Sequence, residues 1–337
     1  MTLEQRISVL ARLGTYLNKL QPEEFTQIAE KAALENPWFT PDNVERAIKG
    51  VSQYLDYNKL LDWTRPYRFN NRSPRTIALV MAGNIPLVGF HDLLCVLISG
   101  NRALAKYSSK DSQLIKFIVN KLIELEPGFS EMVVLTDGQL KSFDAVIATG
   151  SDNSARYFLQ YFGKYPHIIR KNRVSVSVLD GQETDADLTL LGEDIFSYFG
   201  LGCRNVAKIF VPADFDLERL HRAWKKFEPI IHHHKYANNY DYQKSILLVN
   251  RHPFTDFGFV LLKESELLAS PVSVVYFQRY KNLRDVHAEL ERSASKIQCI
   301  VSRVVPNAVP FGQAQYPELW DYADGIDTLR FIESLGT

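Results

Sequence analysis

The chain has 337 residues and a mass of 38.6 kDa, which is too long for one small domain and predicts two domains. Hydrophobic residues make up 46% of it and charged residues 23%, a composition typical of a packed globular protein and not of a disordered or fibrous one. The 39 lysine and arginine residues balance the 39 aspartate and glutamate residues, so no global positive field is present to hold nucleic acid.

The sequence also bears on location and redox state. No apolar run approaches the roughly 18 residues that a membrane span needs, and the charged N-terminus lacks the apolar core of a signal peptide. Three cysteines, Cys95, Cys203 and Cys299, lie far apart without a CxxC pair, so neither a disulfide framework nor a zinc site is expected. We therefore expect a cytoplasmic protein with no metal, no membrane span and no nucleic-acid partner.

The first seventy residues have helical periodicity. Apolar residues recur every three or four positions from Leu3 to Leu20, a second helix starts at Pro22, and Thr40-Pro41 is typical of a third helix start. The polar segment Asn70–Pro74 then breaks the periodicity. Residues 1–74 are therefore predicted to form an N-terminal helical segment.

After this segment, short apolar runs alternate with helical patterns, which predicts a parallel sheet built from crossover units. Strands are expected at 76–81, 102–106, 132–135 and 145–148, with helices at 88–99, 112–125 and 153–162. A second α/β block begins near residue 180, with helices at 188–199 and 217–231 and strands at 207–211, 246–249, 272–277 and 297–301. Residues 306–317 form a tail punctuated by prolines.

The segment around Cys203 is the strongest candidate for chemistry. Gly200 and Gly202 let the backbone pass close to a ligand, and Arg204 favours the nucleophilic thiolate. A GxGxxG fingerprint fails here, because Asn205 stands where the third glycine belongs. The alternative reading is a buried structural cysteine in a tight turn.

Two further turns follow predicted strands. Asn84 comes after the strand at 76–81, at the edge where open α/β sheets bind ligands, and its amide can stabilise an oxyanion. Ala148–Ser151 opens a helix whose N-terminal N–H groups can meet a phosphate. Each turn has a plain alternative: Asn84 can cap the next helix, and 148–151 can be an ordinary connection.

Taken in order, five segments resemble the aldehyde dehydrogenase superfamily, and within it the acyl-CoA reductase branch that includes the fatty-acid reductases of bacterial bioluminescence (the LuxC family). The segments are Gly83–Ser112, Ala148–Ser151, Phe199–Pro212, Leu268–Phe277 and Val309–Gln315. The resemblance implies an aldehyde-dehydrogenase-like α/β fold with two Rossmann-like parallel-sheet domains behind the helical segment. It places a dinucleotide-binding domain at 75–181, a catalytic cysteine domain at 182–305, and a tail at 306–337 that returns to the substrate and cofactor side.

The resemblance also implies roles for single residues. Cys203 matches the catalytic thiol, and Asn84 matches the amide that forms an oxyanion hole with the Cys203 N–H. The implied substrate-binding residues are Gly202, Pro310 and Phe311. The implied cofactor-binding residues are Lys106, Ser109, Thr149, Gly150, Ser151 and Glu266.

Two departures from the family pattern refine these expectations. Aldehyde-oxidising members carry a glutamate that activates water, whereas Ser177 stands near that place here, and a neutral serine is a poor general base. NAD-preferring members often carry a glutamate where this chain has Ser109 followed by Lys110, a pair that would accept a 2′-phosphate. The expected cofactor is therefore NADPH, with NADH as the alternative.

The resulting expectation is an acyl-CoA reductase that makes a fatty aldehyde from an acyl thioester through an S-acyl-cysteine. Coenzyme A enters as part of the substrate, and an acyl-transferring or acyl-activating protein is an expected partner of a homodimer or larger assembly. Three alternatives stay open: an aldehyde-oxidising dehydrogenase, a cysteine acyl hydrolase that uses His91 or His167, and a scaffold without activity.

Overall fold

The computed structural model describes residues 1–69 and 74–335, so most of the expected boundary at Asn70–Pro74 lies outside the described residues. The chain divides into two compact units, the first formed by 1–172 with 318–337 and the second by 173–317. The domain boundary expected after residue 181 lies nine residues beyond this division, which falls after residue 172. The division falls earlier because strand β6 (Val174–Val178) pairs with strands of the second unit.

Four helices open the first unit: α1 (Leu3–Asn18), α2 (Pro22–Glu35), α3 (Pro41–Tyr54) and α4 (Tyr57–Thr64). The Thr2 side chain accepts a hydrogen bond from the Gln5 N–H and starts α1, while prolines occupy the first turn of α2 and α3. The apolar stripe of α1 is buried, as its periodicity predicts. Helix α4 was not expected, because its eight residues are too few to establish a helical period.

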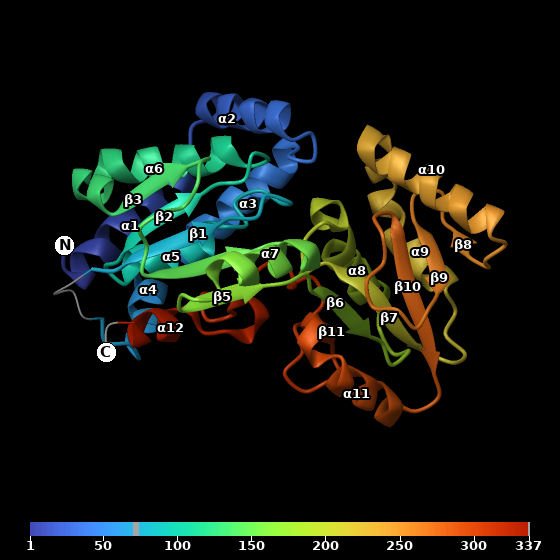
Figure 1. The fold of residues 1–337 in the computed structure, drawn as a ribbon. Helices are drawn as coiled ribbons and strands as arrows, with labels where there is room; N and C mark the ends of the chain where they lie inside the picture. The colour runs from blue at the N-terminus through green and yellow to red at the C-terminus, as the bar shows by residue number, and fades with distance from the viewer. Residues whose placement is uncertain (70–73, 336–337) are drawn as a thin grey trace. The chain divides into compact units, whose positions relative to one another are not determined.

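The first unit is built on a five-stranded parallel sheet with the order β3-β2-β1-β4-β5 (Figure 1). Its strands are β1 (Thr76–Val80), β2 (Arg102–Lys106), β3 (Val133–Thr136), β4 (Ala145–Thr149) and β5 (His167–Arg170). The chain leaves β1 toward β2 on one side and later adds β4 on the other. The order therefore has a switch point between β1 and β4, the position at which open α/β sheets bind ligands.

Helices connect these strands and cover the sheet. Helix α5 (Phe90–Ile98) packs on β1 and β2, and α7 (Asp152–Phe162) packs on β4 and β5. Helix α6 (Ser112–Leu125) contacts α1 and α2, and a 3₁₀ turn η1 (Pro127–Glu131) leads into β3. Residues 93–98 of α5 are all buried, which explains why this part of the helix is apolar on every side.

The C-terminal segment completes the first unit. Trp63 donates from Nε1 to the Tyr322 hydroxyl at 2.8 Å, and the Tyr67 hydroxyl donates to Asp327 at 2.8 Å. A 3₁₀ turn η5 (Ala323–Gly325) precedes the last helix α12 (Thr328–Ser334). The tail expected at 306–337 is therefore divided, since 306–317 belong to the second unit and 318–335 pack on the first.

The second unit contains a six-stranded sheet with the order β11-β6-β7-β10-β9-β8, parallel except for β8. Besides β6, its strands are β7 (Val206–Pro212), β8 (Thr255–Asp256), β9 (Leu261–Glu264), β10 (Val274–Tyr280) and β11 (Ile297–Ser302). Its helices are α8 (Asp185–Phe196), α9 (Glu218–Trp224), α10 (His234–Val249) and α11 (Leu283–Arg292), with 3₁₀ turns η2 (Ser197–Gly200), η3 (Lys225–His232) and η4 (Ala294–Lys296).

The strand expected at 246–249 is wrong, because these residues form the last turn of α10. Leu247 is buried, whereas Leu248 and Val249 are 58% and 81% exposed, so the apolar run does not face a core. A run of four apolar residues fits a strand and a helix end equally well. Strands β5, β6, β8 and β9 were not expected, since they are short or carry polar residues.

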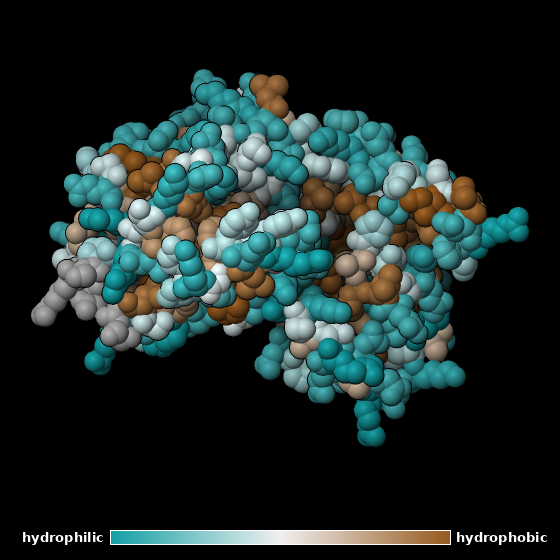
Figure 2. Space-filling view, in the orientation of Figure 1, coloured by the Kyte–Doolittle hydropathy of each residue, from teal (hydrophilic) through white to brown (hydrophobic). Residues whose placement is uncertain are grey.

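The visible surface is mostly hydrophilic, with separate apolar patches, one of them over the end of α10 (Figure 2). Among residues 1–69 and 74–335, no helix has both the length and the apolar character required to cross a bilayer.

Arg170 at the end of β5 provides a test of the first unit's packing. Its side chain is 3% exposed, forms an ion pair with Asp92 of α5 and donates to the Thr328 hydroxyl at 2.8 Å. Arg170→Leu leaves Asp92 without its cation, so we expect urea unfolding to show a loss of about 3 kcal/mol. Arg65→Leu, which breaks an exposed pair with Asp62, is the control and should change little. Equal losses in the two variants would contradict a buried, stabilising pair.

Candidate active site

Asn84 lies at the switch point of the first sheet. It is an exposed residue in the loop after β1, and the end of β1 is in register with Lys106 of β2 and Ala148 of β4. The structure therefore brings the Asn84 loop, Lys106 and the turn after β4 to one edge. Helix α5 begins at Phe90 with Gly89 as its N-cap, so the alternative that Asn84 caps the next helix is wrong.

The expected cofactor residues of the first unit share this edge. Lys106 ends β2 and donates from Nζ to the Gly138 carbonyl at 3.0 Å, while Ser109 is exposed in the loop that follows. Thr149 ends β4, and Ser151 caps α7 by accepting from the Ser154 N–H at 3.2 Å. Ser151 thus has the structural role of a helix cap.

The residues at this edge fit a dinucleotide. A Cβ at Gly150 would lie 2.9 Å from the Phe158 ring and from the Ser154 side chain, so only glycine lets the turn pass this close to α7. The turn presents a helix N-terminus at the switch point of a parallel sheet, where a diphosphate is stabilised. Ser109 and Lys110 are exposed in the loop after β2, the strand on the other side of β1 from β4.

In the second unit, Cys203 is half-buried in the loop between α8 and β7. Three consecutive residues before it are in the left-handed region, with φ of 52° at Tyr198, 58° at Phe199 and 74° at Gly200. Glycine tolerates this conformation, but tyrosine and phenylalanine do so only at a cost that the surroundings must offset. The loop is therefore held in place by other contacts.

The side chain of Asn205 forms hydrogen bonds on both sides of these three residues. Asn205 is 3% exposed, and its Nδ2 donates to the carbonyls of Ser197 at 2.9 Å and Asp194 at 3.1 Å, with Ile195 at 3.3 Å. Its Oδ1 accepts from the Gly202 N–H at 2.8 Å. Asn205 thus closes the end of α8 and fixes the peptide before Cys203. In the sequence, Asn205 was noted only because it stands where the third glycine of a GxGxxG motif would be.

Asp194 and Arg204 join this loop to the segment at 310–315. Asp194 is completely buried and accepts from the Gly312 N–H at 2.7 Å and the Ala314 N–H at 2.9 Å. Arg204 donates from Nε to the Ala314 carbonyl. The expected substrate-side residues are therefore tied to the Cys203 loop; Pro310 is exposed and Phe311 is buried.

A serine of β6 also reaches this loop. Ser175 donates to the Cys203 carbonyl at 3.0 Å and accepts from the Cys299 N–H at 3.2 Å, with the Cys299 sulfur 3.1 Å from its oxygen. Ser177 instead donates to the Val301 carbonyl at 2.9 Å inside the sheet. The hydroxyl that contacts the Cys203 loop thus belongs to Ser175.

Glu266, an expected cofactor ligand, is anchored by its backbone. Its carbonyl accepts from Lys208 Nζ at 3.0 Å, while its side chain is exposed. Lys208 is completely buried and also contacts Glu289 at 3.2 Å and Gln278. This contact fixes the segment after β9 and leaves the Glu266 carboxylate at the surface.

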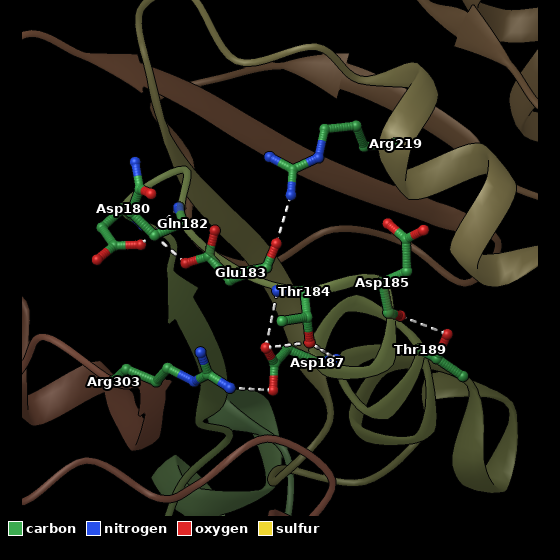
Figure 3. Close-up of polar contacts among 9 residues, drawn as sticks. All are labelled: Asp180, Gln182, Glu183, Thr184, Asp185, Asp187, Thr189, Arg219 and Arg303. Carbon is green, nitrogen blue, oxygen red and sulfur yellow. Dashed lines mark hydrogen bonds and ion pairs between the residues drawn. The ribbon is translucent and has the colours of Figure 1, made fainter.

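Helix α8, which leads to Cys203, is also anchored at its other end (Figure 3). The Thr184 hydroxyl accepts from the Asp187 N–H at 3.2 Å, and the Asp187 carboxylate accepts from the Thr184 N–H at 2.8 Å and pairs with Arg303. Glu183 accepts from the Asp180 N–H at 2.7 Å. A helix fixed at both ends gives the Cys203 loop a rigid base.

The two histidines considered as bases for a hydrolase both lie in the first unit. His91 Nε2 is 3.0 Å from the Leu319 carbonyl, and burial lowers the pKa of His91. His167 Nδ1 is 2.8 Å from the Tyr165 carbonyl. Within the described part of the chain, no group of three or more His, Cys, Asp or Glu residues is arranged to hold a metal ion.

Solved structures share this fold. An indole-3-acetaldehyde dehydrogenase from P. syringae superposes with a TM-score of 0.67 over 90% of this chain and 72% of its own, at 13% identity. An aldehyde dehydrogenase from Mycobacterium tuberculosis gives 0.65 over 93% and 76%, also at 13% identity. The expected fold is thus confirmed as that of the aldehyde dehydrogenases.

Sequence comparison identifies the family within this fold. The family model described as acyl-CoA reductase (LuxC) matches residues 12–222, which is more than half of the chain. The chain belongs to the LuxC acyl-CoA reductase family. A curated relative, long-chain acyl-protein thioester reductase 2 from Photobacterium leiognathi, is 23% identical over an alignment of 191 residues that covers 51% of this chain and 39% of that relative.

The contact between Asp194 and the segment at 310–315 can be tested through the pH dependence of the free energy of unfolding. Burial raises the pKa of Asp194 to about 6, although the N–H groups of Gly312 and Ala314 oppose the rise. The native carboxyl thus binds its proton more tightly than the unfolded one, near 3.9. Its contribution to the free energy of unfolding should fall by about 2–3 kcal/mol as the pH rises from about 4 to about 6.

The measurement is urea unfolding of the wild type and Asp194→Asn across this interval. Subtracting the two curves cancels the other titrating groups. The wild type should lose stability relative to the variant as the pH rises, and parallel curves would contradict a buried Asp194 with a raised pKa.

Proposed function

We propose that this chain is an NAD(P)H-dependent acyl-CoA reductase that converts a fatty acyl thioester into an aldehyde through an S-acyl-cysteine at Cys203. The proposal is supported above all by Cys203 itself, a half-buried thiol in a strained loop fixed by Asn205 and Ser175, in a chain of the LuxC family. A purely structural cysteine would not require so constrained a loop.

In the first step, the Cys203 thiolate attacks the carbonyl carbon of the acyl thioester. The carbonyl electron pair moves to oxygen, and the Cys203 N–H and the Asn84 amide stabilise this oxyanion. Collapse expels coenzyme A as its thiolate and leaves the acyl group on Cys203. Arg204, the next residue, donates from Nε to the Ala314 carbonyl and so connects the loop of the nucleophile to the segment at 310–315.

The acyl-enzyme must avoid water until it is reduced. The hydroxyls of Ser175 and Ser177 donate to main-chain carbonyls, and a neutral hydroxyl used in this way is a poor general base. This arrangement favours reduction over hydrolysis, in contrast to an aldehyde-oxidising dehydrogenase. When bound, a reduced nicotinamide would supply a hydride to the thioester carbon; the C–S bond then breaks, which releases the aldehyde and returns the Cys203 thiolate.

The residues that would hold the dinucleotide are those at the switch point. Thr149, Gly150 and Ser151 form the turn at the N-terminus of α7, and Lys106 ends the strand beside β1. Exposed Ser109 and Lys110 suit the 2′-phosphate of NADPH, and NADH remains the alternative. Glu266 is assigned to the nicotinamide ribose.

The acyl donor is either a fatty acyl-CoA or an acylated partner protein. The Photobacterium leiognathi relative is named as an acyl-protein thioester reductase, although the match covers only 39% of its length. A homodimer or larger assembly in the cytoplasm completes the proposal.

The S-acyl intermediate gives the first test of this function. Incubation with a long-chain acyl-CoA, without reductant, should increase the protein mass by one acyl group, because thioester exchange requires only the thiol. Cys203→Ala should not be acylated, whereas Cys95→Ala, which removes a buried thiol of α5, should be acylated like the wild type.

Equal acylation of Cys203→Ala and the wild type would show that Cys203 is not the nucleophile. Rapid release of free acid from the wild type would favour the hydrolase. Reduction of NADP⁺ by aldehyde in the absence of coenzyme A would favour the oxidising dehydrogenase.

Ser109 tests the cofactor preference. Ser109→Glu places a carboxylate where the 2′-phosphate is expected, so the KM for NADPH should rise about tenfold or more while that for NADH stays nearly constant. Ser130→Glu adds the same charge at an exposed site before β3, at the opposite edge of the sheet, and serves as the control. Initial rates are followed by reduced-nicotinamide absorbance, and equal effects on both cofactors would refute the assigned site.

A further inference from the structure

The loop that carries Asn84 has a strained backbone. It runs from the end of β1 to α5, and Leu87 within it has a φ of 57°. A leucine in the left-handed region costs free energy and persists only when the surroundings fix it. The contacts made by Leu87 therefore determine the shape of the loop.

Leu87 is fixed by Asp111. Asp111 lies at the N-cap position of α6, is 5% exposed, and accepts the Leu87 N–H through Oδ2 at 2.7 Å. An aspartate at this position ordinarily caps its own helix, but the Asp111 side chain makes no such bond. Its carboxyl is directed across to another loop instead.

The capping of α6 is done by Glu35 from α2. Its carboxylate accepts from the Ser112 N–H at 2.7 Å and the Gln113 N–H at 3.1 Å, and it also bonds the Ser112 hydroxyl. Glu35 therefore takes over the role that the position of Asp111 would suggest, and Asp111 remains available for Leu87.

A second contact joins the same two loops on the other side of Asn84. A Cβ at Gly83 would lie 2.4 Å from the Ser108 hydroxyl oxygen and 2.6 Å from the Ser108 Cβ, so the Gly83 backbone packs directly against the Ser108 side chain. Gly83 and Leu87 thus hold the Asn84 loop at both ends against residues 108–111. This segment also contains Ser109 and Lys110.

The environment of the Asp111 carboxyl favours its neutral form. Its second oxygen, Oδ1, is buried and has no hydrogen-bond partner, and burial raises the pKa of Asp111 well above its ordinary value, with the nearby charge of Glu35 adding to the rise. A neutral asparagine can accept from the Leu87 N–H in the same way. Alanine cannot.

We propose that Asp111 is a positioning residue for acyl transfer: its bond to Leu87 holds the loop in the shape that presents the Asn84 amide to the oxyanion. This inference deepens the proposed function and rests on it. Asp111 itself touches neither substrate nor cofactor in this scheme, and it acts only through Asn84.

The test is the single-turnover rate at which acyl-CoA acylates Cys203, measured by quenched mass spectrometry without nicotinamide. Asn84→Ala should lose about 10²–10³-fold. Asp111→Ala should lose at least about tenfold, a part of that effect, and Asp111→Asn should stay within about threefold of the wild type. Asp56→Ala is the matched control, because Asp56 makes the same kind of bond, to the Lys59 N–H at 2.9 Å in α4.

A double-variant cycle distinguishes positioning from general destabilisation. If Asp111 acts through Asn84, Asp111→Ala should add little to the loss already present in Asn84→Ala. The same loss in both backgrounds would overturn the proposal, as would wild-type acylation by Asp111→Ala. If Asn84→Ala acylates normally, the proposed oxyanion role fails before that of Asp111.

A readout that does not depend on activity keeps the two proposals separable. Amide exchange of residues 82–89 should be faster in Asp111→Ala than in the wild type and Asp111→Asn. If the wild type is never acylated but amide exchange of these residues is faster in Asp111→Ala, the proposed function is wrong, whereas the role of the Asp111–Leu87 bond in fixing the loop is supported. Unchanged amide exchange in this loop would show that the Asp111–Leu87 bond does not fix the loop.

Discussion

The Cys203 loop depends on one buried amide. Asn205 donates to the carbonyls that end α8 and accepts from the Gly202 N–H, so a single side chain closes a helix and fixes the peptide before the thiol. These bonds offset the conformational free-energy cost of the three left-handed residues, 198–200, that precede the thiol. Asp194 extends the same buried cluster to the segment at 310–315, so the thiol and its expected substrate side belong to one rigid structure.

In the first unit, several proposed functional groups from different strands lie at one edge of the sheet. The strand order places the ends of β1, β2 and β4 side by side, which gathers the Asn84 loop, Lys106 and the turn at Gly150. Here the loops themselves are held by neighbours from other elements, as Glu35 and Asp111 illustrate. In both units, the groups proposed for chemistry lie on loops, and buried polar side chains fix those loops.

Much of this could be predicted from the sequence. The segments at 76–81 and 102–106 predicted core strands, and the resemblance of five segments in order implied the family and fold, since both depend on residue patterns within short stretches. The run at 246–249 failed because four apolar residues do not distinguish a strand from a helix end. The positions of Cys203 and Asn84 in loops after a helix and a strand were also foreseeable.

The supporting contacts were not foreseeable. Asn205 looked like a defect in a glycine motif, and Ser175, rather than Ser177, proved to contact the Cys203 loop. Asp111 reads as a helix cap from its position, yet Glu35, 76 residues earlier in the chain, makes that cap. Such roles arise from long-range contacts, for which a single sequence contains no local signal.

The proposed function requires that the acyl group on Cys203 is reduced and not hydrolysed. The most direct measurement is a chase, in which acylated enzyme is freed of acyl-CoA and then mixed with NADPH, or with buffer alone. We expect one aldehyde for each acyl group lost with NADPH and a stable acyl-enzyme in buffer. Release of free acid at the same rate in both samples would contradict it.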